Sequence, residues 1–202
     1  MANIITLSRL GLVGLFLRLL YYSTGIGYLV AFFLLILVFS LDAMDGYVAR
    51  RRHEVNRLGA VLDIAVDRIV EYMLWIAFAH LGSISLMIPI IVVARGVLVD
   101  AMRGFVVGKG ETPFGMMKTS WGKRLVSSYF MRSLYGIVKT LSFLLLTFEF
   151  VVHSGVFFQA DFLQGILRPI TLGFVDFTVF LCVVRGFPVL MESRRFFKQD
   201  LK

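Results

Sequence analysis

The sequence predicts an all-α integral membrane protein, and its composition and the length of its apolar runs are the observations that predict it. Apolar residues make up 58% of the 202 residues, and charged residues only 17%. A typical soluble domain carries about 25% charged residues. The mean hydropathy is +0.84. Since so few polar side chains remain to cover a surface that faces water, lipid is the expected solvent.

Six apolar runs are long enough to cross a bilayer, which takes a helix of about 20 residues. We expect these spans at residues 4–22, 26–48, 58–80, 84–106, 129–152 and 166–189. Arg9 and Arg18 interrupt the first run, so this segment could instead lie in the membrane interface as an amphipathic helix. No repeat or linker marks a second domain, so residues 1–202 are expected to form a single membrane domain.

The basic residues alternate between the connections and so predict an orientation. Three segments are rich in Lys and Arg: 50–57, 108–124 and the tail after Met191. Three others contain neither: 23–25, 81–83 and 153–165. Because cytoplasmic loops carry the excess of Lys and Arg, both termini are expected in the cytoplasm of a multi-pass protein of the cell (inner) membrane. The net charge of +8 then fits an anionic bilayer surface, and no nucleic-acid partner is expected.

Four aspartates lie where the second expected span meets the third. Asp42 and Asp45 are three residues apart, and Asp63 and Asp67 are four apart, so each pair lies on one face of its helix. The short basic connection makes the two helices antiparallel neighbours, and the carboxylates can meet at the cytoplasmic edge of the membrane. Clustered carboxylates repel one another and need a positive partner. Hard oxygen ligands suit Mg²⁺ or Mn²⁺, and four are enough for two ions, which can clamp a diphosphate.

Small residues beside the aspartates leave a groove in which a nucleotide could approach the backbone. Gly46 and Ala49 follow on the same helix, and Gly59 opens the facing one. Taken singly, such residues are better explained by close helix packing. Next to four acids they favour a binding site, and Arg50 can bind a diphosphate oxygen there.

This segment resembles the signature of the CDP-alcohol phosphatidyltransferase family. Eight specified residues fall within 26 positions, in the order Asp42-x2-Asp45-Gly46-x2-Ala49-Arg50-x8-Gly59-x3-Asp63-x3-Asp67. The resemblance implies that the four aspartates bind two Mg²⁺ or Mn²⁺ ions, that Asp42 and Asp63 are shared between the ions, and that Asp67 is also the general base. It implies a CDP site lined by Gly46, Ala49, Arg50, Asn56 and Gly59. It also implies a homodimer that transfers a phosphatidyl group from CDP-diacylglycerol to an alcohol and releases CMP.

Shorter matches resemble the phosphatidylglycerophosphate synthases within this family: IVVARGVLVDAMRG at 91–104, SWGKRL at 120–125 and NIITLSRL at 3–10. They favour a small phosphorylated alcohol, glycerol 3-phosphate, as acceptor. The expected acceptor-binding residues are Arg95, Arg103, Lys118, Lys123 and Arg132. The two lysines are equally well explained as cytoplasmic loop residues, whereas Arg95 and Arg132 lie deeper in apolar sequence. A Gly-x-x-Lys-Thr sequence at 136–140 leaves open which lysine corresponds to the one in these enzymes.

Three alternatives remain open. The acceptor could be serine, inositol phosphate or another polyol phosphate. An intramembrane prenyltransferase also uses two aspartate motifs and Mg²⁺, but it places them far apart in the chain. A divalent-cation transporter would carry its acids near the middle of several spans. Glu71, Glu149 and Asp176 are isolated acids in apolar runs, and we expect each to pair with a basic residue or to lie near the interface.

Overall fold

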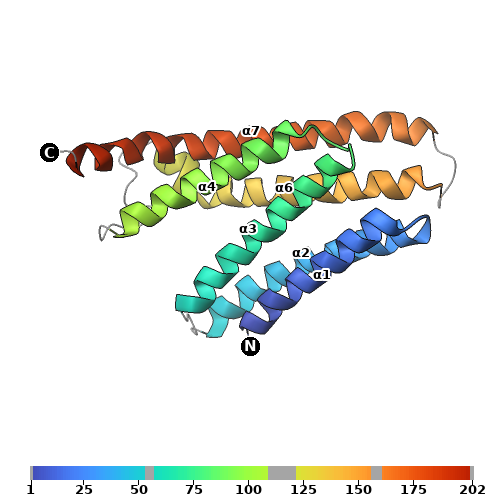
Figure 1. Cartoon of the computed structure of the whole chain (residues 1–202), viewed down its shortest axis with the longest axis horizontal. Coiled ribbons are helices and arrows are strands. Elements are labelled where there is room, and N and C mark those ends of the chain that lie inside the picture. The colour runs from blue at the N-terminus through green and yellow to red at the C-terminus, as the bar shows by residue number, and fades with distance from the viewer. Residues whose placement is uncertain (1, 53–56, 109–121, 156–160, 201–202) are drawn as a thin grey trace. The chain divides into compact units, whose positions relative to one another are not determined.

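The computed structural model describes residues 2–52, 57–108, 122–155 and 161–200, and each regular element in these ranges is a helix. At several helix ends, including 43–52 and 193–200, it describes the backbone alone. The elements in chain order are α1 (Ala2–Tyr22), α2 (Ile26–Arg52), α3 (Arg57–His80), α4 (Met87–Gly108), the π-helix η1 (Lys123–Ser127), α6 (Tyr129–His153) and α7 (Asp161–Asp200), shown in Figure 1. The all-α prediction is therefore confirmed for the described part of the chain.

Five of the expected spans coincide with helices to within a few residues at each end, and the sixth differs. We expected a span at 166–189 followed by a tail, whereas α7 is a single helix of 40 residues. Residues 191–200 contain neither Gly nor Pro, so the usual signals that end a helix are missing there. The basic residues of this segment therefore lie on a continuation of the helix.

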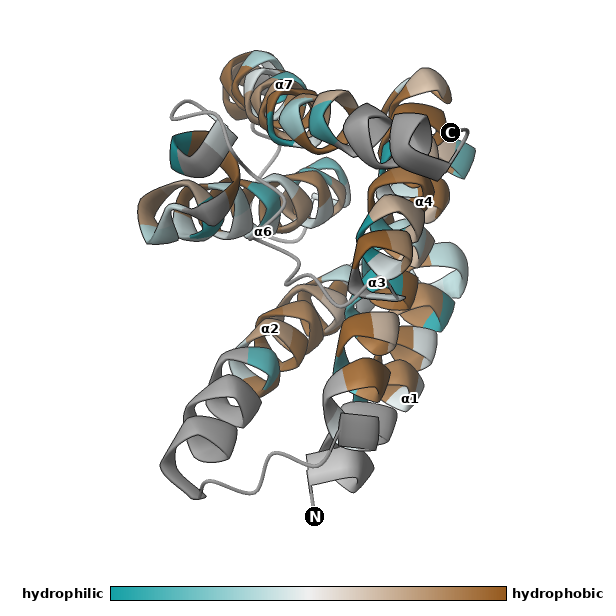
Figure 2. Cartoon of the chain, turned by 90° about the vertical axis from the view of Figure 1, so that its left-hand side faces the viewer, coloured by the Kyte–Doolittle hydropathy of each residue, from teal (hydrophilic) through white to brown (hydrophobic). Residues whose placement is uncertain are grey.

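Two described segments are long and apolar enough to cross a membrane by length and composition, Tyr129–His153 and Phe162–Glu192. A shorter apolar segment covers Ile26–Asp42. Figure 2 shows α2 as hydrophobic over most of its coloured length, with a hydrophilic band next to its grey end. Hydroxyl groups inside these helices bond to their own backbone: Thr147 Oγ1 donates to the carbonyl of Phe143 at 2.8 Å. Such bonds satisfy a polar side chain in apolar surroundings.

Glycines in the left-handed backbone region follow three of the helices. Gly25, Gly82 and Gly155 have φ angles of 52°, 73° and 71°, and they lie after α1, α3 and α6. A residue without a Cβ adopts this conformation with little strain, so each glycine allows the chain to turn out of its helix. These turns lie in the connections that contain no Lys or Arg.

The chain divides into two compact units. The first consists of Met1–Ile84 and Thr140–Leu172, and thus of α1, α2, α3, most of α6 and the start of α7. Within it α1 and α2 lie side by side and antiparallel, and α1 also packs against α3 (Figure 1). Its aromatic core centres on Phe143, whose ring centroid is 4.5 Å from that of Trp75. The contacts of α1 with α2 and α3 place it beside the two helices on which the aspartates lie.

The second unit consists of Ser85–Lys139 and Gly173–Lys202. It contains α4, η1, the start of α6 and most of α7. Four valines form a buried cluster in it, Val99, Val106, Val126 and Val189. The cluster joins α4, η1 and α7, and α4 and α7 also carry the half-buried residues Arg95, Arg103 and Arg185.

Candidate active site

Three of the four signature aspartates come together in the first unit. Asp42 lies on α2, and Asp63 and Asp67 lie in the first turns of α3. One carboxylate oxygen from each lies within 4.8 Å of the other two. All three side chains are half-buried, so a cation can reach them from solvent. Three hard oxygen donors at this separation are a donor set that fits Mg²⁺ or Mn²⁺.

A buried arginine lies among these carboxylates. Arg9 of α1 has only 2% of its side chain exposed, and its Nη1 is 2.7 Å from Asp42 Oδ1 and 3.8 Å from Asp63 Oδ1. Its Nη2 donates to Asp67 Oδ1 at 2.9 Å. One guanidinium thus connects α1 to α2 and α3. A buried cation needs such partners, because burial without them is costly.

Arg9 is a residue of this cluster to which the sequence interpretation assigned no role. In the sequence it is a charge that interrupts the first span and a member of the NIITLSRL match, and neither observation assigned it a role. A charged residue inside an apolar segment normally faces a partner of opposite sign, and clustered aspartates were the obvious candidates. The aspartate helices were also expected to pack directly on each other. The structure adds α1, which packs against both of them.

The other residues predicted to bind metal or the CDP group lie at the edge of the described structure. Asp45, Gly46, Ala49 and Arg50 lie on the last turns of α2, but their side chains are outside the described part. Asn56 falls outside the described residues. Gly59 is half-buried near the start of α3, on the turn before Asp63. The CDP site therefore stays a prediction.

A second cluster, of basic residues, lies in the second unit. Arg185 of α7 interacts electrostatically with Arg95 and Arg103 of α4 and with Arg132 of α6. Its guanidinium lies over the ring of Tyr135, 5.3 Å from the centroid, and Lys139 Nζ lies 5.6 Å from the same centroid. Within the described residues, Nε of Arg95 and Nε of Arg185 are buried without a hydrogen-bond partner. Like charges gathered with unused donors favour the binding of an anion.

Arg95 is held by a close approach to α7. A Cβ added at Gly186 would lie 2.7 Å from Arg95 Nε and 2.9 Å from its Cγ. Such distances are too short for carbon, so glycine at this position leaves the space that the Arg95 side chain fills. Arg95 therefore packs closely against the backbone of α7 at Gly186.

The basic cluster brings together three of the predicted acceptor-binding residues, Arg95, Arg103 and Arg132. Lys118 lies outside the described residues, and Lys123 begins η1 with its side chain outside the described part. The cluster also contains Arg185, Lys139 and Tyr135, which we had not assigned. Arg185 is a charged residue in a long apolar helix, and that signal could have identified it.

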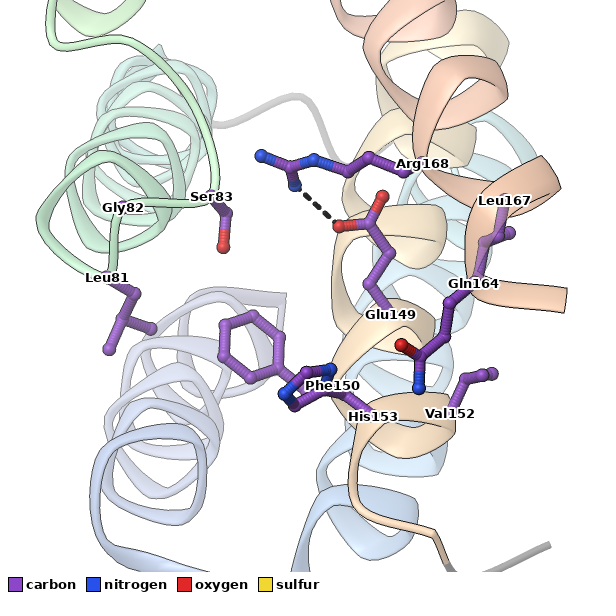
Figure 3. Close-up of a pocket in the computed structure, with 10 residues that line it drawn as sticks. All are labelled: Leu81, Gly82, Ser83, Glu149, Phe150, Val152, His153, Gln164, Leu167 and Arg168. Atoms are coloured by element: carbon purple, nitrogen blue, oxygen red, sulfur yellow. Dashed lines mark hydrogen bonds and ion pairs between the residues drawn. The ribbon is translucent and has the colours of Figure 1, made fainter. Parts of the chain in front are cut away.

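Two of the isolated acids pair with arginines, as predicted. Glu71 lies 3.4 Å from Arg68, one turn away on α3. Glu149 of α6 lies 2.7 Å from Arg168 of α7, and this pair lines a cavity of about 420 Å³ (Figure 3). Asp176 is exposed. The cavity lies beyond the last residue of α3, about 25 Å along that helix from Asp63, so it is separate from the aspartates.

Comparison with known proteins agrees with the aspartate signature. The sequence model of the CDP-alcohol phosphatidyltransferase family matches residues 1–175. A CDP-diacylglycerol–glycerol-3-phosphate 3-phosphatidyltransferase of Pseudomonas fluorescens is 26% identical over 158 residues, which cover 76% of this chain and 81% of that protein. A probable phosphatidylglycerophosphate synthase of Mycobacterium tuberculosis is 29% identical over 62% of this chain and 59% of its own length. Because the family match covers most of the sequence and includes the carboxylate cluster, the chain belongs to the CDP-alcohol phosphatidyltransferase family.

Proposed function

We propose that the protein transfers the phosphatidyl group of CDP-diacylglycerol to glycerol 3-phosphate and releases CMP. The observation that carries this proposal is the cluster of Asp42, Asp63 and Asp67, whose oxygen atoms lie within 4.8 Å of one another at the family signature. The names of the relatives in Pseudomonas fluorescens and Haemophilus influenzae support glycerol 3-phosphate as the acceptor. The second of these is 29% identical over 48% of this chain and 52% of its own length.

The carboxylates are proposed to hold two Mg²⁺ or Mn²⁺ ions, with Asp45 as the fourth ligand. When bound, the ions would neutralise the diphosphate and favour departure of CMP. Asp67 would accept the proton of the acceptor hydroxyl. The hydroxyl oxygen then forms a bond to the phosphatidyl phosphorus, and the bond from that phosphorus to the bridging oxygen breaks, so that CMP leaves with the bridging oxygen. Gly46, Ala49, Arg50, Asn56 and Gly59 are proposed to bind the CDP part of the donor.

The basic cluster of the second unit is proposed to bind the phosphate of the acceptor. Arg95, Arg103, Arg132 and Arg185 bring several guanidinium groups together. A guanidinium group can form paired, charge-assisted bonds with phosphate oxygens. Lys118 and Lys123 stay candidates for the same role. A phosphorylated alcohol brings a negative charge to this concentration of positive charge, so the cluster favours it over a neutral acceptor such as serine.

The membrane arrangement completes the proposal. We propose a multi-pass homodimer of the cell (inner) membrane, with six spans, both termini and the active site on the cytoplasmic side, and one domain per chain. The alternation of basic and uncharged connections supports this topology. A donor with two acyl chains also requires a site that lies at the membrane surface.

The reaction is tested by measuring CMP release from CDP-diacylglycerol with purified protein and a panel of acceptors. Glycerol 3-phosphate should support release, while inositol phosphate and serine should give little. CMP release with inositol phosphate alone would show that the acceptor is inositol phosphate and not glycerol 3-phosphate. Cation transport that persists in an Asp67→Asn variant unable to release CMP would favour the transporter instead.

A further inference from the structure

We infer that Arg9 is the built-in counter-ion of the carboxylate cluster and that it competes with the divalent cation for the same carboxylates. In this role Arg9 is a positioning residue, because it acts on the aspartates rather than on a substrate. The inference rests on the metal-binding function proposed above. It concerns the affinity of the site for its cation, which the family signature leaves open.

The geometry places Arg9 on the atoms that a cation would use. Its two terminal nitrogens lie 2.7 Å from Asp42 Oδ1 and 2.9 Å from Asp67 Oδ1. Oxygen atoms of the same three carboxylates form the set that lies within 4.8 Å and fits a metal ion. A guanidinium and a divalent cation would therefore share ligands, or at least lie within a few ångströms of each other.

Charge decides the direction of the effect. The three carboxylates carry three negative charges and Arg9 one positive charge, so the cluster has a net charge of two negative charges. Replacing Arg9 with a neutral residue raises the net charge of the cluster to three negative charges. It also removes the repulsion between the guanidinium and the metal ion, which is twice as strong for a divalent ion as for a monovalent one. Arg9 also helps to hold the carboxylates together, and loss of this ordering acts in the opposite sense. Repulsion at such a short distance is the larger effect, so a neutral residue should tighten cation binding.

The bonding of Arg9 also permits its displacement. Only 2% of the side chain is exposed, and yet Nε is buried without a hydrogen-bond partner in the described part of the chain. The guanidinium is thus held by its charge and by few bonds rather than by a complete set of acceptors. A cation with a higher charge can take over the carboxylates without breaking a large hydrogen-bond network.

The test is a titration of purified, chelator-treated protein with Mn²⁺, followed by the electron paramagnetic resonance signal of the free ion. Arg9→Met and Arg9→Gln remove the charge, Arg9→Lys keeps it, and Arg18→Met is the matched control. Arg18 lies nine residues further along α1 and is exposed. Both neutral variants should bind Mn²⁺ about tenfold more tightly than the wild type. Arg9→Lys should stay within about threefold of the wild type, and Arg18→Met should not differ from it.

Thermal unfolding gives a second readout. Without cation the neutral Arg9 variants should unfold at a lower temperature than the wild type, and saturating Mn²⁺ should recover most of the difference. A purely structural role predicts weaker binding together with lower stability. Neutral variants that bind Mn²⁺ equally or more weakly, or that do not fold even with saturating Mn²⁺, would overturn the inference. A wild type that binds no Mn²⁺ would instead contradict the proposed function itself.

Discussion

Arg9 donates a hydrogen bond of 2.9 Å to Asp67, although 58 residues separate the two in the chain. The contact joins the first helix to the pair of helices that carry the family signature. It places α1 beside the carboxylate cluster, whereas the sequence predicts for this helix only a membrane span or an interfacial position. The carboxylates lie on two helices, α2 and α3, and a third helix, α1, supplies the arginine that lies among them. The net charge of the group therefore depends on a residue outside the signature.

Replacing the proposed general base should stop turnover. Asp67→Asn keeps the size of the side chain but cannot accept the acceptor's proton, so kcat should fall by about 100-fold or more. CMP release measures this, with Asp176→Asn as the control because Asp176 is an exposed acid of α7. A variant that still binds Mn²⁺ and keeps full turnover would show that Asp67 is not the base.

An added methyl group at Gly186 should weaken acceptor binding. In Gly186→Ala the new Cβ would lie 2.7 Å from Arg95 Nε, so the Arg95 side chain must move. The KM for glycerol 3-phosphate should rise by about threefold to tenfold, with a smaller change in the KM for CDP-diacylglycerol. Gly173→Ala is the matched control on the same helix, because nothing lies within 4 Å of a Cβ there. Equal kinetics for the two variants would argue against a binding role for Arg95.

Removal of the Arg185 charge should weaken the binding of the phosphorylated acceptor more than the binding of the lipid donor. Arg185 lies over the ring of Tyr135 and interacts with Arg95, Arg103 and Arg132. Arg185→Gln should raise the KM for glycerol 3-phosphate by about tenfold, since a charge-assisted bond to phosphate is lost. Arg124→Gln removes an exposed charge of η1 and should change little. A similar rise in the KM for the lipid donor would indicate general disruption of the unit instead.

The ion pair between Glu149 and Arg168 should contribute little to stability. Its atoms are 2.7 Å apart, but 43% of the Arg168 side chain is exposed, so solvent screens the attraction. A double-mutant cycle with Glu149→Gln and Arg168→Gln should give a coupling energy below about 1 kcal/mol. A coupling of several kcal/mol would mean that the pair is effectively buried, for example by lipid.

The sequence predicts the helices well because apolar runs of about 20 residues are a strong local signal. It predicts Asp42, Asp63 and Asp67 for the same reason, since helical spacing orders each pair and the signature is specific. Arg9 and Arg185 were missed because their partners lie on other helices. The spacing of residues within one helix does not predict which helices pack against each other. The length of α7 was not predicted because the expected span was bounded by its apolar run, whereas the helix continues through the polar residues that follow it.

The dependence of CMP release on divalent cations, compared between the wild type and Asp63→Asn, tests the central claim most directly. With CDP-diacylglycerol and glycerol 3-phosphate supplied, the wild type should release CMP with Mg²⁺ or Mn²⁺ and stop when a chelator is added. Asp63→Asn loses a charged ligand of the cluster, so its release should fall by about 100-fold or more at the same cation concentration. Release that continues in excess chelator, or an Asp63→Asn variant with wild-type turnover and cation dependence, would contradict the assignment of the carboxylate cluster as the reaction centre.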